Sequence, residues 1–409
     1  MKNIRCKESI LVKCDDIIVN LLFATVFFLA LSPEMTTVCL LTSAITWFVK
    51  LILTKGKCFH RTPFDKLILV FIILSFSSVF VSPDKGFSFY NYYNLMGRYI
   101  LIYYLVIQNI ITFHQLKILM YMLGASAVAV ILYGFYQYIF GIDISNMLWV
   151  DGEKFPELKT RVFSTLQNPN ILAGYLLVVM LIIFGFICKV KKILGRLVLI
   201  LFFLMAGTCL AMTYSRGAWI SLLIVLTVYG VFKNKFILMP IIFFIAAVGI
   251  FDQSLTERFL SAFHAGDTSS NMRLGIWEST IAMILDHPLL GIGWGAFWMV
   301  YPSYDFFIQN DAVLIVHAHN MYLNFAAEIG VLGLLAFLAV MIKHIHLALT
   351  STNLRASTFL NGLTLGCGLS MVAVAINGFT DYVLFNIELS MLFWLVCAII
   401  VISCRRSLD

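Results

Sequence analysis

The stretch NILAGYLLVVMLIIFGFICKVKK, residues 170–192, decides the fold class. Residues 170–188 carry no charged side chain, and three lysines follow within the next four positions. About 20 consecutive apolar residues are enough to cross the roughly 30 Å hydrocarbon core of a bilayer as a helix. Lys and Arg are retained on the cytoplasmic side of such helices. We therefore expect a membrane-spanning helix that ends on the cytoplasmic side at the KVKK segment.

The composition extends this expectation to the whole chain. Of the 409 residues, 61% are hydrophobic and only 12% are charged, whereas a soluble domain carries roughly 25% charged residues. This balance excludes a soluble globular protein. The net charge of +7 follows the membrane topology described below, so it does not indicate a nucleic-acid partner.

Apolar runs between charged or Pro/Gly-rich breaks predict an all-α, polytopic integral membrane protein with about twelve transmembrane helices. Residues 1–409 would form a single membrane domain. The basic N-terminus resembles a signal peptide, but no A-x-A cleavage site follows, so we interpret it as a retained first helix. The predicted spans are 17–32, 35–53, 66–82, 98–112, 117–140, 170–188, 194–212, 217–232, 235–251, 321–343, 357–376 and 383–403.

The distribution of Lys and Arg orients these spans. With both termini in the cytoplasm, the inner segments hold 20 of the 28 positive residues, and the reverse orientation would place those 20 outside. This topology predicts a large external loop, residues 252–320, between spans nine and ten. Its tryptophans suit the membrane interface, so we expect helices that lie along the surface. The outer segments then hold only Lys85, Arg98, Lys154, Lys159, Arg161, Arg216, Arg258 and Arg273.

The nine cysteines indicate neither a disulfide nor a metal site. None falls in a long external loop, and no CxxC or Cys/His spacing typical of a metal site occurs. We predict no structural disulfide.

The outward-facing arginines are the first candidates for a functional site. Arg216 lies in a very short external turn between two spans, and a guanidinium donates a fixed fork of hydrogen bonds to phosphate. Arg273 begins a predicted interfacial helix, residues 271–287, capped by Ser270 or Asn271 and ended by Pro288. Both arginines could bind an anion. They could also contact lipid headgroups, and Arg273 could pair with Glu278. Arg258 and Arg161 are weaker candidates of the same kind.

The segment HAHN, residues 317–320, is the candidate catalytic segment. Asn320 is placed to cap the tenth span, and the N-terminus of a helix favours a neutral imidazole at His319. A neutral His is the commonest general base. His319 could instead be an interfacial residue bonded to the backbone. A metal site that uses His317 and His319 is a further alternative, although no third ligand occurs at a fixed spacing. The glycines of GIGWG, residues 291–295, predict a tight loop, since no strand flanks them.

Several motifs occur in an order that resembles the O-antigen ligase and O-antigen polymerase superfamily of bacterial membrane glycosyltransferases. The resemblance covers residues from about 160 to 385, and residues 1–150 show no motif that matches. The motifs are RVFSTLQNPNILAGYL (161–176), SRGAW (215–219), RLGIWE (273–278), HPLLGIGWGAFW (287–298), HAHNMYLNFAAEIGVLG (317–333) and NGFTDYVLFN (377–386).

The resemblance implies a metal-independent, inverting transfer on the external face of the bacterial inner membrane, without a cofactor. It implies a donor glycan carried on undecaprenyl pyrophosphate and a glycan or lipid-linked acceptor, with a chain-length regulator or flippase as possible partners. The essential His of the family matches His319, and its phosphate-binding arginines match Arg216 and Arg273. His317 matches the first His of a family H-x-H-N pattern.

Two alternatives remain open at this point. A ligase and a polymerase share these residues, and some relatives attach glycans to protein. The stretch 149–170 is similar to versions from Gram-positive bacteria, which have no lipid A-core, and so favours a polymerase. A secondary transporter or flippase also fits twelve spans. A transporter would need charged groups near the bilayer midplane and a repeat between its halves, and the sequence shows neither.

Overall fold

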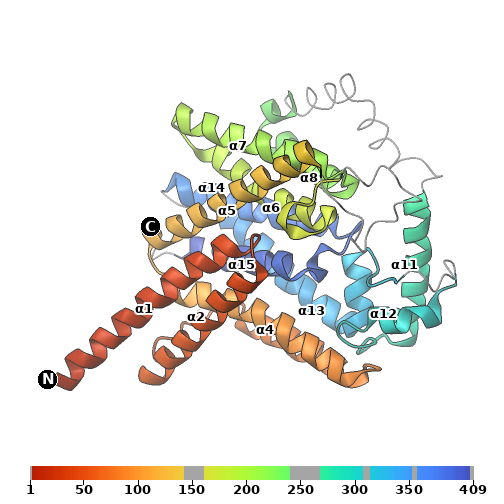
Figure 1. Cartoon of the computed structure of the whole chain (residues 1–409), viewed down its shortest axis with the longest axis horizontal. Helices are drawn as coiled ribbons and strands as arrows, with labels where there is room; N and C mark the ends of the chain where they lie inside the picture. The colour runs from red at the N-terminus through yellow and green to blue at the C-terminus, as the bar shows by residue number, and fades with distance from the viewer. Residues whose placement is uncertain (1, 142–160, 240–267, 307–313, 352–356, 406–409) are drawn as a thin grey trace.

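The computed structural model describes residues 2–141, 161–239, 268–306, 314–351 and 357–405, and within them every regular element is a helix (Figure 1). The all-α prediction is confirmed. The elements are α1 (Lys2–Phe28), α2 (Pro33–Leu53), α3 (Asp65–Ser78), η1 (Val79–Val81), α4 (Lys85–Asn109), α5 (Phe113–Phe140), η3 (Ser164–Leu166), α6 (Pro169–Lys189), α7 (Ile193–Met212), α8 (Arg216–Lys233), η4 (Lys235–Ile237), α11 (Thr268–Asp286), α12 (Phe297–Val300), η5 (Tyr301–Tyr304), α13 (Met321–Ser351), α14 (Thr358–Asn377), η6 (Val383–Phe385) and α15 (Ile387–Ser403).

Seven helices among the described residues are long and apolar enough to cross a membrane, namely α2, α5, α6, α7, α8, α13 and α14. The chain is therefore a multi-pass membrane protein. α15 is a shorter apolar helix, and α1, α3 and α4 overlap three further predicted spans. Most of the predicted span 235–251 lies outside the described residues. The total of twelve spans and the cytoplasmic position of both termini stay predictions.

Helix α6 forms the centre of the bundle because its neighbours cover nearly all of its surface. It packs against α14 (Figure 1), and both helices carry glycine at the contact. A Cβ added to Gly185 would lie 2.3 Å from the carbonyl oxygen of Gly362 and 2.4 Å from the nitrogen of Gly366. Small residues allow this close approach of two backbones, which is the usual basis of helix packing within a membrane.

Helix α7 shows the opposite distribution of exposure. Its sequence is nearly as apolar as that of α6, yet Leu194, Leu197, Val198 and Leu201 are each at least half exposed. In water, such a surface would favour association or aggregation. In a bilayer it is the surface that contacts lipid, as the sequence predicted.

Helix α13 is interrupted at Gly330, where the backbone has φ 72° and ψ 170°. The GIGWG loop fills the break. The N–H of Ile292 donates to the carbonyl of Ala327 at 2.8 Å, and that of Gly293 donates to the carbonyl of Glu328 at 3.0 Å. These bonds satisfy carbonyls that the interrupted helix leaves without their usual partners. The predicted tight loop is confirmed, with positive φ at Gly291, Gly293 and Gly295.

Three predicted helix starts are wrong. α1 begins at Lys2 rather than near residue 17. α4 begins at Lys85 rather than near residue 98, because the Asp84 side chain accepts the N–H of Phe87 at 2.9 Å and caps the helix there. α11 begins at Thr268, so the proposed caps Ser270 and Asn271 lie inside the helix. Its end is as predicted, at Asp286, two residues before Pro288.

Candidate active site

The HAHN segment has an unusual backbone that two neighbouring segments hold in place. His319 has φ 48°, in the left-handed region that non-glycine residues rarely adopt. Such a conformation costs about 1–3 kcal/mol and persists only where the surroundings impose it. Here the N–H of Met321 donates to the carbonyl of Gly378 at 2.8 Å, and the Asn320 amide donates to the carbonyl of Phe379 at 3.1 Å.

Asn320 is the N-cap of α13, as predicted. Its side-chain oxygen accepts the N–H groups of Tyr322 at 3.0 Å and Leu323 at 3.1 Å. Because the same side chain also contacts Phe379, one residue both starts the helix and ties HAHN to the loop after α14.

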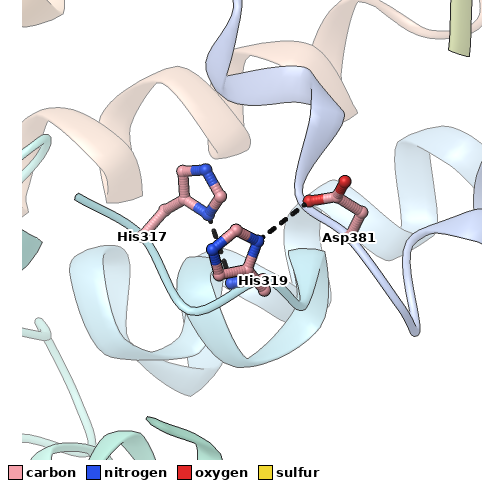
Figure 2. A group of neighbouring side chains, drawn as sticks. All are labelled: His317, His319 and Asp381. Carbon is pink, nitrogen blue, oxygen red and sulfur yellow. Dashed lines mark hydrogen bonds and ion pairs between the residues drawn. The ribbon is translucent and has the colours of Figure 1, made fainter. Parts of the chain in front are cut away.

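Asp381 is the partner of His319 (Figure 2). The Nδ1 atom of His319 lies 3.3 Å from Oδ1 of Asp381, and the side chains are 35% and 10% exposed. Asp381 lies 62 positions from His319 in NGFTDYVLFN, and it is not among the residues predicted from the sequence. One signal could have found it, since it is an isolated carboxylate in an otherwise uncharged segment between two spans.

The carboxyl of Asp381 stays ionised. Burial raises its pKa, but the hydrogen bond and charge of His319, together with the charge of Arg273, hold the pKa well below its usual range. An ionised carboxylate on Nδ1 fixes the orientation of the imidazole and directs Nε2 toward a reacting group. The pair therefore has the arrangement of a general base and its orienting acid group.

His317 has a different environment from His319. It is buried, and its Nδ1 accepts the backbone N–H of His319 at 3.2 Å. Burial lowers its pKa to about 3. The charge of Arg273, and that of His319 when it is protonated, lower it further, and the carboxylate of Asp381 opposes them. His317 is thus neutral, and it stabilises the strained backbone of its neighbour (Figure 2).

Arg273 reaches the site through helix α11. The indole N–H of Trp277, one turn after Arg273, donates to the carbonyl of Ala318 at 3.0 Å. The charge of Arg273 lowers the pKa of both His317 and Asp381, so the guanidinium lies within electrostatic range of them. Leu274 and Leu285 of α11 are more than half exposed, which is typical of a helix in the membrane interface.

Arg216 is the first residue of α8, directly after the short turn in which the sequence placed it. The next residue, Gly217, packs against the segment before Asp381. A Cβ at Gly217 would lie 2.4 Å from Oγ1 of Thr380 and 3.1 Å from Oδ1 of Asn377. The start of α8 and the carboxylate that orients His319 are therefore neighbours.

Arg161 braces the turn that precedes Arg216. Its Nε donates to the carbonyl of Thr213 at 2.7 Å, and its Nη2 donates to Oδ1 of Asn170 at 2.8 Å. The structure therefore gives this arginine contacts to the protein next to the site. Arg258, the fourth predicted arginine, lies outside the described residues.

A buried polar network lies beneath HAHN, and sequence reasoning missed it. Asn324 accepts the backbone N–H of Ala318 at 3.0 Å and lies beside Glu328, whose carboxyl accepts the N–H of Gly295 at 3.1 Å. Glu328, His317 and several aromatic rings line a cavity of about 120 Å³. Buried networks of this kind limit the conformations that a segment can adopt.

The site gathers at one end of the bundle. α6, α8 and α13 begin there, and α7 and α14 end there. Lys189 and Lys343 are predicted to be cytoplasmic. Lys189 is the last residue of α6 and Lys343 lies in the second half of α13, so both are distant from the end that carries the site. The structure therefore brings together His317, His319 and the start of α8, with Arg273 within electrostatic range, and it adds Asp381.

A family model described as O-antigen ligase matches residues 200–338. These residues include Arg216, Arg273 and the complete HAHN segment, so the resemblance to the O-antigen ligase and polymerase superfamily is confirmed. No curated protein matches the chain. The match and the apolar helices together support an O-antigen ligase-type membrane enzyme.

Proposed function

We propose that this O-antigen ligase-type membrane protein is an inverting glycosyltransferase of the bacterial inner membrane. It transfers a glycan from undecaprenyl pyrophosphate to an acceptor hydroxyl on the external face, and it needs no metal ion. The observation that carries the proposal is the His319–Asp381 pair, held on a strained backbone within range of Arg273.

His319 is the proposed general base. With Nδ1 directed at Asp381, Nε2 accepts the proton of the acceptor hydroxyl as its oxygen attacks the anomeric carbon. The new C–O bond forms on the face opposite the pyrophosphate, whose own C–O bond breaks with the electron pair leaving on the phosphate oxygen. Asp381 stabilises the imidazolium that forms. A base of this kind contributes about 10²–10⁴-fold to the rate.

Arg273 and Arg216 are the proposed phosphate ligands. As the glycosidic bond breaks, negative charge grows on the pyrophosphate, and fixed guanidinium groups stabilise that charge more than they stabilise the bound donor. The start of α8 adds the positive end of a helix dipole next to Arg216. Arg161 acts through the turn that it braces, and His317 through the backbone of His319, so both are positioning residues in this proposal.

The arrangement of the two ends of the bundle supports the proposed external location. The positive-inside rule places the lysines after α6 in the cytoplasm, and HAHN precedes α13 at the other end. A lipid-linked donor with its pyrophosphate at the outer leaflet would reach Arg273 on the interfacial helix α11.

The acceptor distinguishes two versions of the enzyme. We favour a polymerase, which adds the glycan to the terminal sugar of another lipid-linked repeat, over a ligase that needs a separate acceptor. Incubation of the purified chain with lipid-linked repeat alone tests this choice. A ladder of products indicates a polymerase, and no change indicates that a separate acceptor is needed.

The same purified chain tests transfer itself. Reconstituted in liposomes with donor and acceptor, it should form glycan product, and a His319→Ala variant should not. Uptake of labelled substrate into the liposomes without any product would contradict the proposal and favour a transporter or flippase.

A further inference from the structure

His317, His319 and Asp381 form a compact group of metal-ligating side chains (Figure 2). One ligand atom from each residue lies within 4.8 Å of the other two. Sequence analysis found two histidines without a third ligand, and the fold supplies that ligand from the loop after α14. We propose that these three residues bind a divalent transition-metal ion, for which Zn²⁺ is the probe, and that the bound ion inhibits glycan transfer.

The donor set indicates which ions would bind. Two imidazoles and one carboxylate suit Zn²⁺ and its neighbours late in the first transition row, whereas Mg²⁺ and Ca²⁺ prefer oxygen ligands alone. Two ligands of a tetrahedral Zn²⁺ lie about 3.4 Å apart, given bonds of roughly 2.0–2.1 Å. The three atoms therefore need to approach one another by about 1 Å or slightly more. The partly exposed His319 ring can supply this movement and also leaves a path for the ion.

The two segments that carry the ligands are already joined. The backbone bond from Met321 to Gly378 and the side-chain bond from Asn320 to Phe379 hold HAHN against the loop of Asp381. A site whose ligands are held together in advance loses less conformational freedom on binding than a flexible one.

One charge opposes the ion. Arg273 acts on both His317 and Asp381, and its positive charge also repels a cation. The site offers three protein ligands rather than the four of a structural zinc site. We therefore expect reversible binding, weaker than that of a structural site, with a coordination position open to water.

We expect inhibition because the metal ion and the proposed reaction would use the same lone pairs of His319 and Asp381. A metal ion on His319 occupies a ring nitrogen of the base and removes Asp381 from its orienting contact. This half of the inference depends on the proposed function, whereas the binding half does not. Ambient Zn²⁺ outside the cell would then regulate the enzyme.

The binding half is tested on the full chain in detergent after treatment with a chelator, by calorimetric titration with Zn²⁺ at pH 7.5. We expect one saturable site in the wild type. Asp381→Asn keeps the shape of the side chain but removes its charge, and it should weaken binding by roughly tenfold or more. His319→Ala should do the same. His114→Ala, which removes an exposed His at the start of α5, is the matched control and should bind as the wild type does.

Equal affinity in the wild type, Asp381→Asn and His319→Ala would overturn the site, as would no binding in any of them. His317→Gln provides a second, uncharged change in the same cluster. Identical elution of all variants on size exclusion would show that a loss of binding is not a loss of fold.

The inhibitory half is tested by transfer assays with and without Zn²⁺. Inhibition that a chelator reverses supports it. Zn²⁺ that binds at the cluster without slowing transfer would overturn it, as would transfer that stops with the chelator and returns with Zn²⁺. If the chain transfers no glycan at all, the proposed function fails, and the titration still decides the metal site independently.

Discussion

Two histidines at opposite ends of the HAHN–α13 segment have opposite surroundings. His344 is completely buried, its Nδ1 lies 2.8 Å from the carbonyl of Val340, and its Nε2 lies 3.2 Å from the hydroxyl of Tyr103. Its ring also stacks on Phe64 at 3.9 Å. His319 is partly exposed, has a left-handed backbone and bonds Asp381 through one nitrogen. Because both ring nitrogens of the buried His344 have hydrogen-bond partners, we assign it a packing role. The strained backbone and partial exposure of His319 indicate a catalytic role instead.

The strongest test of this contrast is His319→Ala. Loss of the base should reduce transfer by about 10²–10⁴-fold, with little change in the melting temperature because the ring is partly exposed. The rate of glycan product formation and a thermal melt in detergent measure the two effects. A variant with near-normal transfer would show that another group takes the proton.

Asp381→Asn should have the next largest effect. Asn retains a polar contact to His319 but cannot hold the ring in one tautomer or stabilise the imidazolium, so we expect a loss of about 10²-fold in kcat. Saturation kinetics with the lipid-linked donor should show KM nearly unchanged. A selective rise in KM would assign Asp381 to substrate binding rather than to orientation of the base.

Arginine-to-lysine changes should have smaller effects. In Arg273→Lys or Arg216→Lys, the charge remains but the fork of donors is lost, and we expect a loss of about tenfold in kcat/KM, or roughly 1.4 kcal/mol. Lys85→Arg, in the first turn of α4 and also on the predicted outer side, is the control. It exchanges one cationic side chain for another away from the proposed phosphate ligands. Unchanged rates in both arginine variants would exclude a phosphate clamp.

His344→Ala should reverse the pattern of His319→Ala. It leaves a cavity beside Phe64 and removes the partner of the Tyr103 hydroxyl, at an expected cost of about 2–4 kcal/mol. Transfer per folded molecule should stay within about twofold of the wild type. The melting temperature and the activity of the monodisperse fraction test both statements. A large loss of activity at normal stability would give His344 a functional role.

The buried His317 predicts a loss of stability in acid. Its pKa is about 3 in the folded protein, against an ordinary value of 6.5. The unfolded chain therefore binds more protons between these values, and stability that is complete above pH 6.5 falls as the pH drops toward 3. The slope is at most about 1.4 kcal/mol per pH unit. Melting temperatures of wild type and His317→Asn across this range should converge at low pH, and parallel curves would contradict the assignment.

The helices were predictable because few backbone conformations other than a helix are stable in the core of a bilayer. Each spanning segment must satisfy its own backbone hydrogen bonds, so an uncharged run such as residues 170–188 becomes a helix, here Pro169–Lys189. Where the predicted helices differ from the structure, the difference depends on contacts with neighbouring residues. The break at Gly330 depends on the loop of Gly291, and the early start of α4 depends on the cap by Asp84.

By itself, the sequence determined that the protein lies in a membrane, where its helices are and which segment carries His319. These features depend on hydropathy, positive charge and helix caps, which act over a few residues. The pairing of His319 with Asp381, 62 positions away, and the contact of α8 with Thr380 are tertiary. Distances between such segments depend on how the helices pack, and that packing is a property of the whole bundle rather than of any one stretch.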